Sequence, residues 1–284
     1  LRKAEIVEEL GRPFTIEVEL VSDDEEISLD DILGQNVTIR LETDNESRFF
    51  NGIVTEFFQK ENIARTACFG AVVKPWFWLL TLSENCRIFQ EKAYPDIIKS
   101  VFEDLGFSDY EDQLTGTYSP QEYVVQYNES DFNFVSRIME QEGIYYYFTH
   151  TNGKHSMVLA DDSSVQPNIG DIPFYEKEET AHIIDVEGIV KWENYRKIRT
   201  GGISLGDFDF TTPSKNLSSV TADPKTGSLA SLQKFNYPGK YTEQANGKNY
   251  TKILMEKENV HYDQKYCEGN TRTLYAGSQF KLID

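Results

Sequence analysis

The sequence contains few of the residues on which metal sites and disulfide-stabilised folds depend. Its 284 residues include 3 cysteines and 4 histidines. Cys68, Cys86 and Cys267 are odd in number, far apart and without C-x-x-C spacing, which argues against a disulfide framework and a zinc site. This cysteine usage favours a reducing compartment such as the cytoplasm, and we expect neither a metal ion nor another cofactor.

Positive charge and long apolar runs are also scarce. The chain has 28 Lys+Arg against 47 Asp+Glu, a formal net charge of -19. Such a chain repels nucleic acid and anionic lipid surfaces; the acidity serves solubility or, as the alternative, meets a basic partner. No segment reaches the ~18 consecutive apolar residues of a membrane helix. The chain opens on the charged "LRKAEIVEEL", which is not a signal peptide, so we expect no stable membrane insertion.

Alternation of apolar and polar residues is frequent in the first quarter of the chain. A two-residue period is the pattern of half-buried strands. It occurs in "FTIEVEL" (14–20), "NVTIRLE" (36–42), "SRFFNGIVTEFF" (47–58) and "ARTACFGAVV" (64–73). We therefore predict that residues 1–88 form a first antiparallel β-barrel, with a sandwich as the alternative.

Two later stretches have apolar residues at helical spacing. "PDIIKSVFEDLGF" (95–107) places its apolar residues on one stripe, with proline at the start and glycine at the stop. "SDFNFVSRIMEQEG" (130–143) predicts a second helix, with Ser130 or Asn128 as its N-cap.

Two strands are expected after the second helix. They flank Asn152 and Gly153, which suit a type I′ hairpin turn. Together with the two helices they predict an α+β insertion over residues 89–162.

The last part of the chain again favours strands. Residues 161–173 are rich in turn formers and predict a linker. Strand-like stretches then occur at 182–193, 202–210 and 279–283, and a helical pattern lies near 242–258. We predict a second β-barrel over residues 163–284 that contains this helix, and hence a β-rich α+β protein with two antiparallel barrels bracketing an insertion.

One stretch matches a nucleophile motif. Gly202, Ser204 and Gly206 fit G-x-S-x-G, which is catalytic when the serine lies on a tight turn between a strand and a helix. Here "DFDFTTP" follows, which predicts no helix, so we interpret the stretch as a strand edged by glycines.

Two carboxylate pairs, Glu129 with Asp131 and Glu140 with Glu142, raise the question of a glycosidase. Glycosidases need two carboxyl groups facing each other across a substrate. Residues two apart on or beside a helix point in different directions, so solvated helix faces and capping acids are the preferred explanation.

The histidines are scattered along the chain. Only His150 and His155, on either side of the hairpin turn, can approach each other, whereas His182 and His261 are remote in sequence. No carboxylate or thiolate completes a ligand set in their sequence neighbourhood, so we predict a surface pair. We expect no catalytic, cofactor-binding or metal-binding residue and no enzyme activity.

Aromatic residues are the strongest remaining signal, with 16 Tyr, 18 Phe and 3 Trp. Clusters such as "PWFWLL" and "IYYYF" suit the core of a β protein, a large subunit interface or, less well, a sugar-binding platform.

Several motifs in order resemble the VgrG spike proteins of bacterial type VI secretion and, more distantly, the tail-hub proteins of contractile phages, including the late control protein D group. The matching stretches are "FNGIVTEF" (50–57), "KPWFWLLTLSENCRIFQ" (74–90), "DIIKSVFEDLGF" (96–107), "YVVQYNESDFNFVSRIMEQEGIYYYFTH" (123–150), "LGDFDFTTPSKNL" (205–217), "FNYPGKY" (235–241) and "YAGSQFKL" (275–282). The resemblance covers the hub region of that family, so no activity of its needle or effector domains is carried over.

The resemblance implies a non-enzymatic structural hub. It implies a homotrimer in which paired barrels imitate sixfold symmetry and seat on a hexameric Hcp tube, with effector cargo and baseplate proteins as further partners. The hub would be assembled in the cytoplasm and exported with the spike, helping to puncture target membranes. The tail hub of a contractile phage is the alternative, and a peptidoglycan glycoside hydrolase or a carbohydrate-binding module are further ones.

Overall fold

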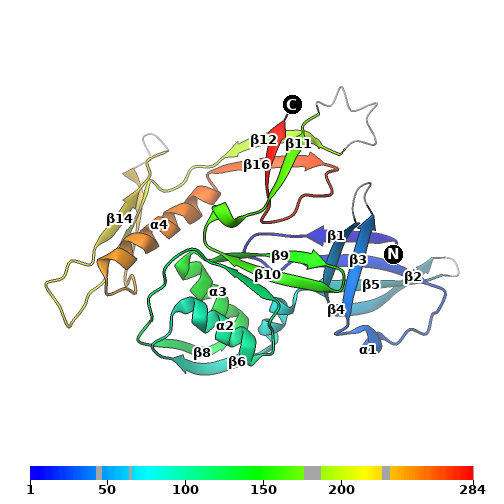
Figure 1. Ribbon diagram of the computed structural model, residues 1–284, viewed down its shortest axis with the longest axis horizontal. Coiled ribbons are helices and arrows are strands. Elements are labelled where there is room, and N and C mark those ends of the chain that lie inside the picture. The colour runs from blue at the N-terminus through cyan, green and yellow to red at the C-terminus, as the bar shows by residue number, and fades with distance from the viewer. Residues whose placement is uncertain (43–46, 64–65, 176–186, 226–230, 284) are drawn as a thin grey trace. The chain divides into compact units, whose positions relative to one another are not determined.

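The computed structural model describes residues 1–42, 47–63, 66–175, 187–225 and 231–283. The chain folds into two compact units (Figure 1). Unit 1 contains Leu1–Gly170 and Arg272–Lys281, and unit 2 contains Asp171–Thr271 and Leu282–Asp284. The unit boundaries fall within two strands, β11 (Asn168–Pro173) and β17 (Gln279–Ile283), which form a two-stranded sheet.

Unit 1 begins with a five-stranded antiparallel sheet. Its spatial order is β1 (Lys3–Val7), β2 (Thr15–Ser22), β5 (Thr66–Lys74), β4 (Ser47–Ile63) and β3 (Asn36–Glu42). In β2, Ile16 and Val18 are buried while Glu17 between them is exposed, as the two-residue period predicts. The short helix α1 (Leu29–Ile32) connects β2 to β3. The order is linear with β1 and β3 at its edges, so the described strands form an open, half-barrel sheet.

Both predicted helices of unit 1 are confirmed. Helix α2 (Tyr94–Asp104) has Pro95 in its first turn and buries Ile97, Ile98, Val101 and Phe102. Helix α3 (Asp131–Glu142) is capped by Ser130, whose hydroxyl accepts from the Asn133 N–H at 3.1 Å. Gly143 ends α3 with φ +74°, a conformation that favours glycine over residues with a Cβ.

Strands frame these helices. They are β6 (Glu84–Phe89) with β8 (Val124–Ser130), and β7 (Tyr110–Gln113) with β10 (Lys154–Ala160) and β9 (Tyr145–Thr151). The hairpin β9–β10 is confirmed, but its predicted type I′ turn is wrong. Gly153 has φ +85°, whereas Asn152 is not in the positive-φ region, so only one of the two required left-handed residues is present. The 3-10 helix η1 (Trp76–Leu82) was not predicted.

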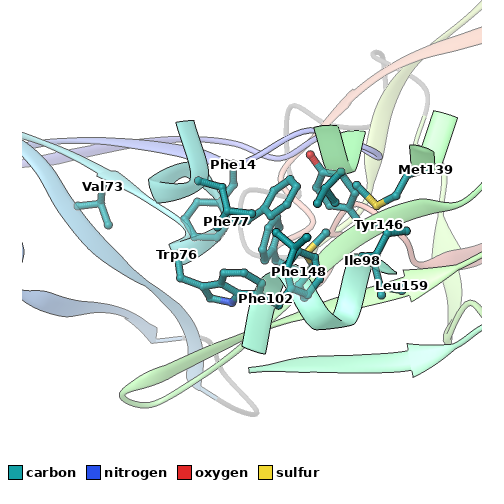
Figure 2. Packing of buried hydrophobic residues seen from close by; sticks show 14 of the residues in the cluster. Phe14, Val73, Trp76, Phe77, Ile98, Phe102, Met139, Tyr146, Phe148 and Leu159 are labelled. Carbon is teal, nitrogen blue, oxygen red and sulfur yellow. The ribbon is translucent and has the colours of Figure 1, made fainter. Parts of the chain in front are cut away.

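One aromatic core joins the first sheet to the helices of unit 1 (Figure 2). Phe14 of the first sheet region meets Phe148 of β9 edge-to-face, with ring centroids 5.1 Å apart. Phe77 of η1 likewise meets Phe102 of α2 at 5.8 Å. Edge-to-face contacts fix ring orientations as well as burying area, so this core holds sheet and helices in one arrangement.

Unit 2 is built from small sheets and one helix. The strands are β12 (Ile189–Arg196) paired with β16 (Asp263–Gly269), and β14 (Ser219–Ala222), β13 (Gly202–Leu205) and β15 (Gln233–Asn236) in that order. Helix α4 (Gln244–Val260) confirms the predicted helix and packs on β13 and β14.

The strand predictions in the last part of the chain need correction. The predicted linker at 161–173 does contain the boundary between the two units after Gly170, but it is not structureless, because it includes the 3-10 helix η2 (Ser163–Val165) and β11. The stretch 202–210 is a strand only as far as Leu205. The stretch 182–193 is a strand from Ile189 onward, while 182–186 lie outside the described residues. Strand β17 confirms the prediction at 279–283.

Candidate functional site

Ser204 does not lie on a nucleophile elbow. It is an interior residue of β13, paired with Val220 on one side and Phe235 on the other. The strand ends at Leu205 and no helix follows it before residue 225. The interpretation as a strand with flanking glycines is confirmed.

Two of the four carboxylates that suggested a glycosidase, Asp131 and Glu129, are held by arginines. Asp131 is 1% exposed, and its Oδ1 contacts Arg87 Nη2 while its Oδ2 accepts from the Ser83 hydroxyl at 2.6 Å. Glu129 accepts from Arg137 at 2.7 Å. The prediction of a solvated or capping acid is therefore wrong for Asp131, which belongs to a buried ion pair between β6 and α3. Glu140 and Glu142 lie on the last turn of α3.

His150 and His155 do approach each other, with ring centroids 6.3 Å apart, but the prediction of a surface pair is wrong. His155 is 4% exposed, and the His150 side chain is 6% exposed. The two rings lie beneath the hairpin rather than on it, next to Phe14. His261 is exposed in unit 2, and His182 lies outside the described residues.

The hydrogen bonds of His155 define its protonation state. Its Nε2 accepts from the Trp76 backbone N–H at 2.9 Å, and its Nδ1 lies 2.8 Å from Asn51 Oδ1. A backbone N–H can only donate, so Nε2 carries the lone pair and the proton resides on Nδ1. Burial and the neighbouring His150 lower the pKa of His155 to about 4.

Asn51 is the centre of this buried polar cluster. Its Nδ2 donates to Asn36 Oδ1 at 2.6 Å and to Thr38 Oγ1 at 2.8 Å, and its backbone N–H donates to His150 Nδ1 at 3.1 Å. These bonds attach the β9–β10 hairpin to β3 and β4 of the first sheet. The cluster therefore links the hairpin to the first sheet within unit 1.

Sequence reasoning missed one acid near this cluster. Glu8 Oε1 lies 3.6 Å from His150 Nε2, and Glu8 Oε2 accepts from Arg48 Nη2 at 3.0 Å. The sequence separation between Glu8 and the hairpin hid the contact. Even so, within the residues that the structure describes no group of three or more His, Cys, Asp or Glu side chains could hold a metal ion.

One side of a sheet in unit 2 is apolar and exposed. Residues paired across neighbouring strands point to the same side of a sheet. Ile203 and Leu205 of β13 are buried, and Thr221 beside Ile203 bonds Thr251 of α4 at 2.8 Å, so this side carries the helix.

The opposite side of that sheet has no covering element among the described contacts. Val220 and Phe235 flank Ser204 there with exposures of 54% and 65%, and Tyr237 follows at 63%. A Cβ at Gly206 would lie 3.4 Å from the Phe235 ring, an ordinary van der Waals contact, so the ring lies beside Gly206 as well. We define this as the apolar face: Gly206, Val220, Phe235 and Tyr237.

Two further exposed aromatics follow β13 directly. Phe208 is 58% exposed and Phe210 is 82% exposed. A contiguous cluster of exposed apolar side chains on a folded domain usually marks a surface that binds another molecule. The sequence signal for these aromatics is the "DFDF" pattern at 207–210, whose alternation predicts a strand instead.

No helix in the described part of the chain combines the length and the apolar character needed to span a bilayer. His155, Asp131, Glu129 and Ser204 are each accounted for by structural contacts. The exposed apolar residues of β14, of β15 and of the segment after β13 are the surface that these residues present to other molecules.

Comparison with known proteins agrees with this description. The chain matches the family described as phage tail baseplate hub (GPD) over residues 7–284. It is 39% identical to the type VI secretion system spike protein VgrG1b of Pseudomonas aeruginosa and 38% identical to VgrG1c of the same organism, each over 99% of this chain. The chain spans 38% and 39% of the length of these two relatives.

Two solved structures share the fold. One is the E. coli c3393 protein, a type VI secretion component with similarity to T4 bacteriophage tail proteins gp27 and gp5, at TM-score 0.73 and 18% identity over 99% of this chain and 64% of that chain. The other is the 43 kDa tail protein of prophage MuSo2 from Shewanella oneidensis, at TM-score 0.62 and 11% identity over 95% and 80%. With the family match extending over almost every residue, the chain belongs to the phage tail baseplate hub family.

Proposed function

We propose that the chain is the structural hub of a contractile injection machine, namely the base of a type VI secretion spike. The observation that carries this proposal is the hub-family match over residues 7–284 together with 39% identity to a spike protein. In this role the chain is not an enzyme. It acts as a homotrimer that seats on a hexameric Hcp tube, contacts baseplate proteins and helps carry effectors through a target membrane.

The symmetry of a trimer explains how this chain could seat on a sixfold tube. Residues 1–88 and 163–284 would supply two antiparallel barrels on either side of the α+β insertion at 89–162. Three chains would then present six similar barrels around one axis, which matches a sixfold tube without a symmetry clash. The open five-stranded sheet of unit 1 supports the first barrel to the extent that it supplies half of one.

The apolar face supports self-association. Copies of a chain with net charge -19 repel one another, so a stable trimer needs apolar burial to overcome that repulsion. Obligate interfaces bury exposed apolar area of the kind that the apolar face supplies through Val220, Phe235 and Tyr237. Phe210, four residues after Gly206, adds to this area.

Sedimentation equilibrium of the full-length gene product tests the trimer. We expect the wild type to have three times the monomer mass, and the double variant Phe210→Ser, Phe235→Ser to dissociate at micromolar concentrations. Leu82→Ser is the matched control, since Leu82 is 69% exposed but lies in unit 1. A monomeric wild type would contradict the proposal, and a trimeric double variant would remove the apolar face from it.

The hub of a contractile phage tail is a second candidate, favoured by the family description and by the fold shared with a prophage tail protein. The two differ in how the protein leaves the cytoplasm in which it is assembled. Export that stops when the type VI sheath gene is deleted identifies a spike. Recovery of the protein in sedimenting tail particles, independent of that gene, identifies a phage hub.

A further inference from the structure

An open cleft of about 550 Å³ lies on one side of the ribbon β12–β16 in unit 2. Side chains alternate between the two sides of a strand, and residues paired across two strands share a side. Tyr195 pairs with Gln264, and Glu193 pairs with Tyr266, so these four side chains stand on the same side of the ribbon. All four line the cleft.

Tyrosine rings form the apolar part of the cleft. Tyr195 is 55% exposed and Tyr266 is 49% exposed. The Tyr266 hydroxyl donates to Glu268 Oε1 at 2.9 Å, and Lys191 Nζ lies 4.8 Å from the centroid of the Tyr266 ring. These two contacts hold the ring in place before a ligand arrives, so binding costs less conformational entropy than it would for a mobile side chain.

Three polar groups of the lining have no partner among the residues that the structure describes. They are the Tyr195 hydroxyl, the side-chain amide of Gln264 and the Lys197 ammonium. A tyrosine hydroxyl and a glutamine amide can each donate and accept, whereas an ammonium only donates. The cleft therefore presents both donors and acceptors next to aromatic rings.

Most of the charge in the cleft is already paired. Lys191 Nζ lies 2.9 Å from Glu268 Oε1 and 3.4 Å from Glu193 Oε1, and Lys265 Nζ lies 2.6 Å from Asp263 Oδ1. A ligand therefore needs no charge of its own, and a polyanion is disfavoured by the net charge of -19.

A wholly apolar ligand does not suit the cleft either. It would remove water from the Gln264 amide and the Tyr195 hydroxyl without replacing the hydrogen bonds, and such groups are costly to leave unpaired. The ligand that complements this lining has an apolar face and a rim of groups that both donate and accept.

We propose that the cleft binds a neutral saccharide. The C–H bonds of a sugar ring form an apolar face, which packs on the rings of Tyr195 and Tyr266. The hydroxyl groups at its rim bond the Gln264 amide and accept from Lys197. This inference goes beyond the hub function and does not depend on it.

Calorimetric titration of the full-length gene product tests the proposal. The probes are maltotriose, cellotriose and triacetylchitotriose, and sorbitol is the control because it carries hydroxyl groups on an open chain without a ring face. We expect at least one trisaccharide to bind saturably with a Kd of about 1 mM, and sorbitol to show no saturation at about tenfold higher concentration.

Variants locate the site. Tyr195→Ser removes a ring at an exposed position and should weaken binding about tenfold. Gln264→Leu keeps the apolar stem but removes the amide, and should weaken binding about fivefold. Tyr127→Ser is the control, since Tyr127 is 77% exposed but lies in unit 1, and it should keep wild-type affinity.

The far-ultraviolet circular dichroism of each variant shows whether it is folded. No saturation by any of the three trisaccharides, equal affinity for sorbitol, or unchanged affinity in folded Tyr195→Ser would overturn the proposal. If Tyr195→Ser does not fold, Gln264→Leu decides with Tyr195→Phe, which keeps the ring. Weaker binding by Gln264→Leu with near wild-type binding by Tyr195→Phe supports the site, and wild-type affinity in Gln264→Leu overturns it.

Discussion

Acidification should destabilise unit 1 through His155. The pKa of this ring falls from its ordinary value of 6.5 to about 4 in the folded protein, because burial disfavours the charged form and the neighbouring His150 lowers it further. Above pH 6.5 the ring is neutral in both states and contributes no pH dependence. As the pH falls below 6.5, His155 becomes protonated in the unfolded chain but stays neutral in the folded chain. The free energy of unfolding therefore decreases until about pH 4 and then levels off.

The magnitude follows from linkage. Each unit of difference between the folded and unfolded pKa values corresponds to about 1.4 kcal/mol. The free energy of unfolding therefore decreases by about 3 kcal/mol by pH 4. By pH 5 the loss is about 2 kcal/mol, since the unfolded ring is then almost fully charged. Several carboxylates titrate over the same range, so the measurement needs a variant that lacks only the ring.

Urea unfolding of the wild type and of His155→Gln supplies that comparison. Both carry Trp192→Phe, which leaves tryptophans only in unit 1. We expect the free energy of unfolding of the wild type to fall by about 2 kcal/mol more than that of His155→Gln between pH 7 and pH 5. His261→Gln should retain the wild-type pH dependence. Parallel curves for wild type and His155→Gln would refute the assignment of a neutral buried ring.

Two further changes test the supports of α3. Ser130→Ala removes the N-cap bond to the Asn133 N–H and should lower the free energy of unfolding by about 1 kcal/mol in urea titrations, and an unchanged midpoint would mean that water replaces the cap. Asp131→Ala leaves Arg87 without its buried partner and should lower the free energy of unfolding by about 3 kcal/mol. Glu140→Ala on the same helix is the control and should leave it nearly unchanged. A loss below about 1 kcal/mol for Asp131→Ala would show that Asp104 and Gln126 are sufficient partners for Arg87.

Features of the fold that depend on local pattern could be predicted from the sequence. The alternation in β2 and the apolar stripe of α2 are properties of short windows, and the glycine stop of α3 needs one residue. The β11 strand failed the same approach. Its window is rich in turn formers, and what makes it a strand is pairing with β17, more than a hundred residues later in the chain.

The buried histidines could not be predicted for the same reason. His155 bonds Trp76 from 79 residues away, and His150 bonds Asn51 from 99 residues away. A histidine beside a turn is usually exposed, and only these partners make burial of the polar ring tolerable. The sequence alone could not assign each aromatic residue to the core or to an interface either. Trp76 and Tyr146 belong to the core, whereas the exposed aromatics lie around β13.

The two units differ in how much of their stability they can supply themselves. Unit 1 contains the large aromatic core, whereas the buried cluster around α4 consists of Leu205, Leu217, Tyr241 and Tyr250. The ribbon β12–β16 has two strands whose side chains are mostly exposed, and an isolated two-stranded ribbon is marginally stable in water. A partner that covers the apolar face binds only folded unit 2 and therefore adds its binding free energy to that unit's stability. Under the trimer proposed above, assembly and folding of unit 2 are therefore coupled.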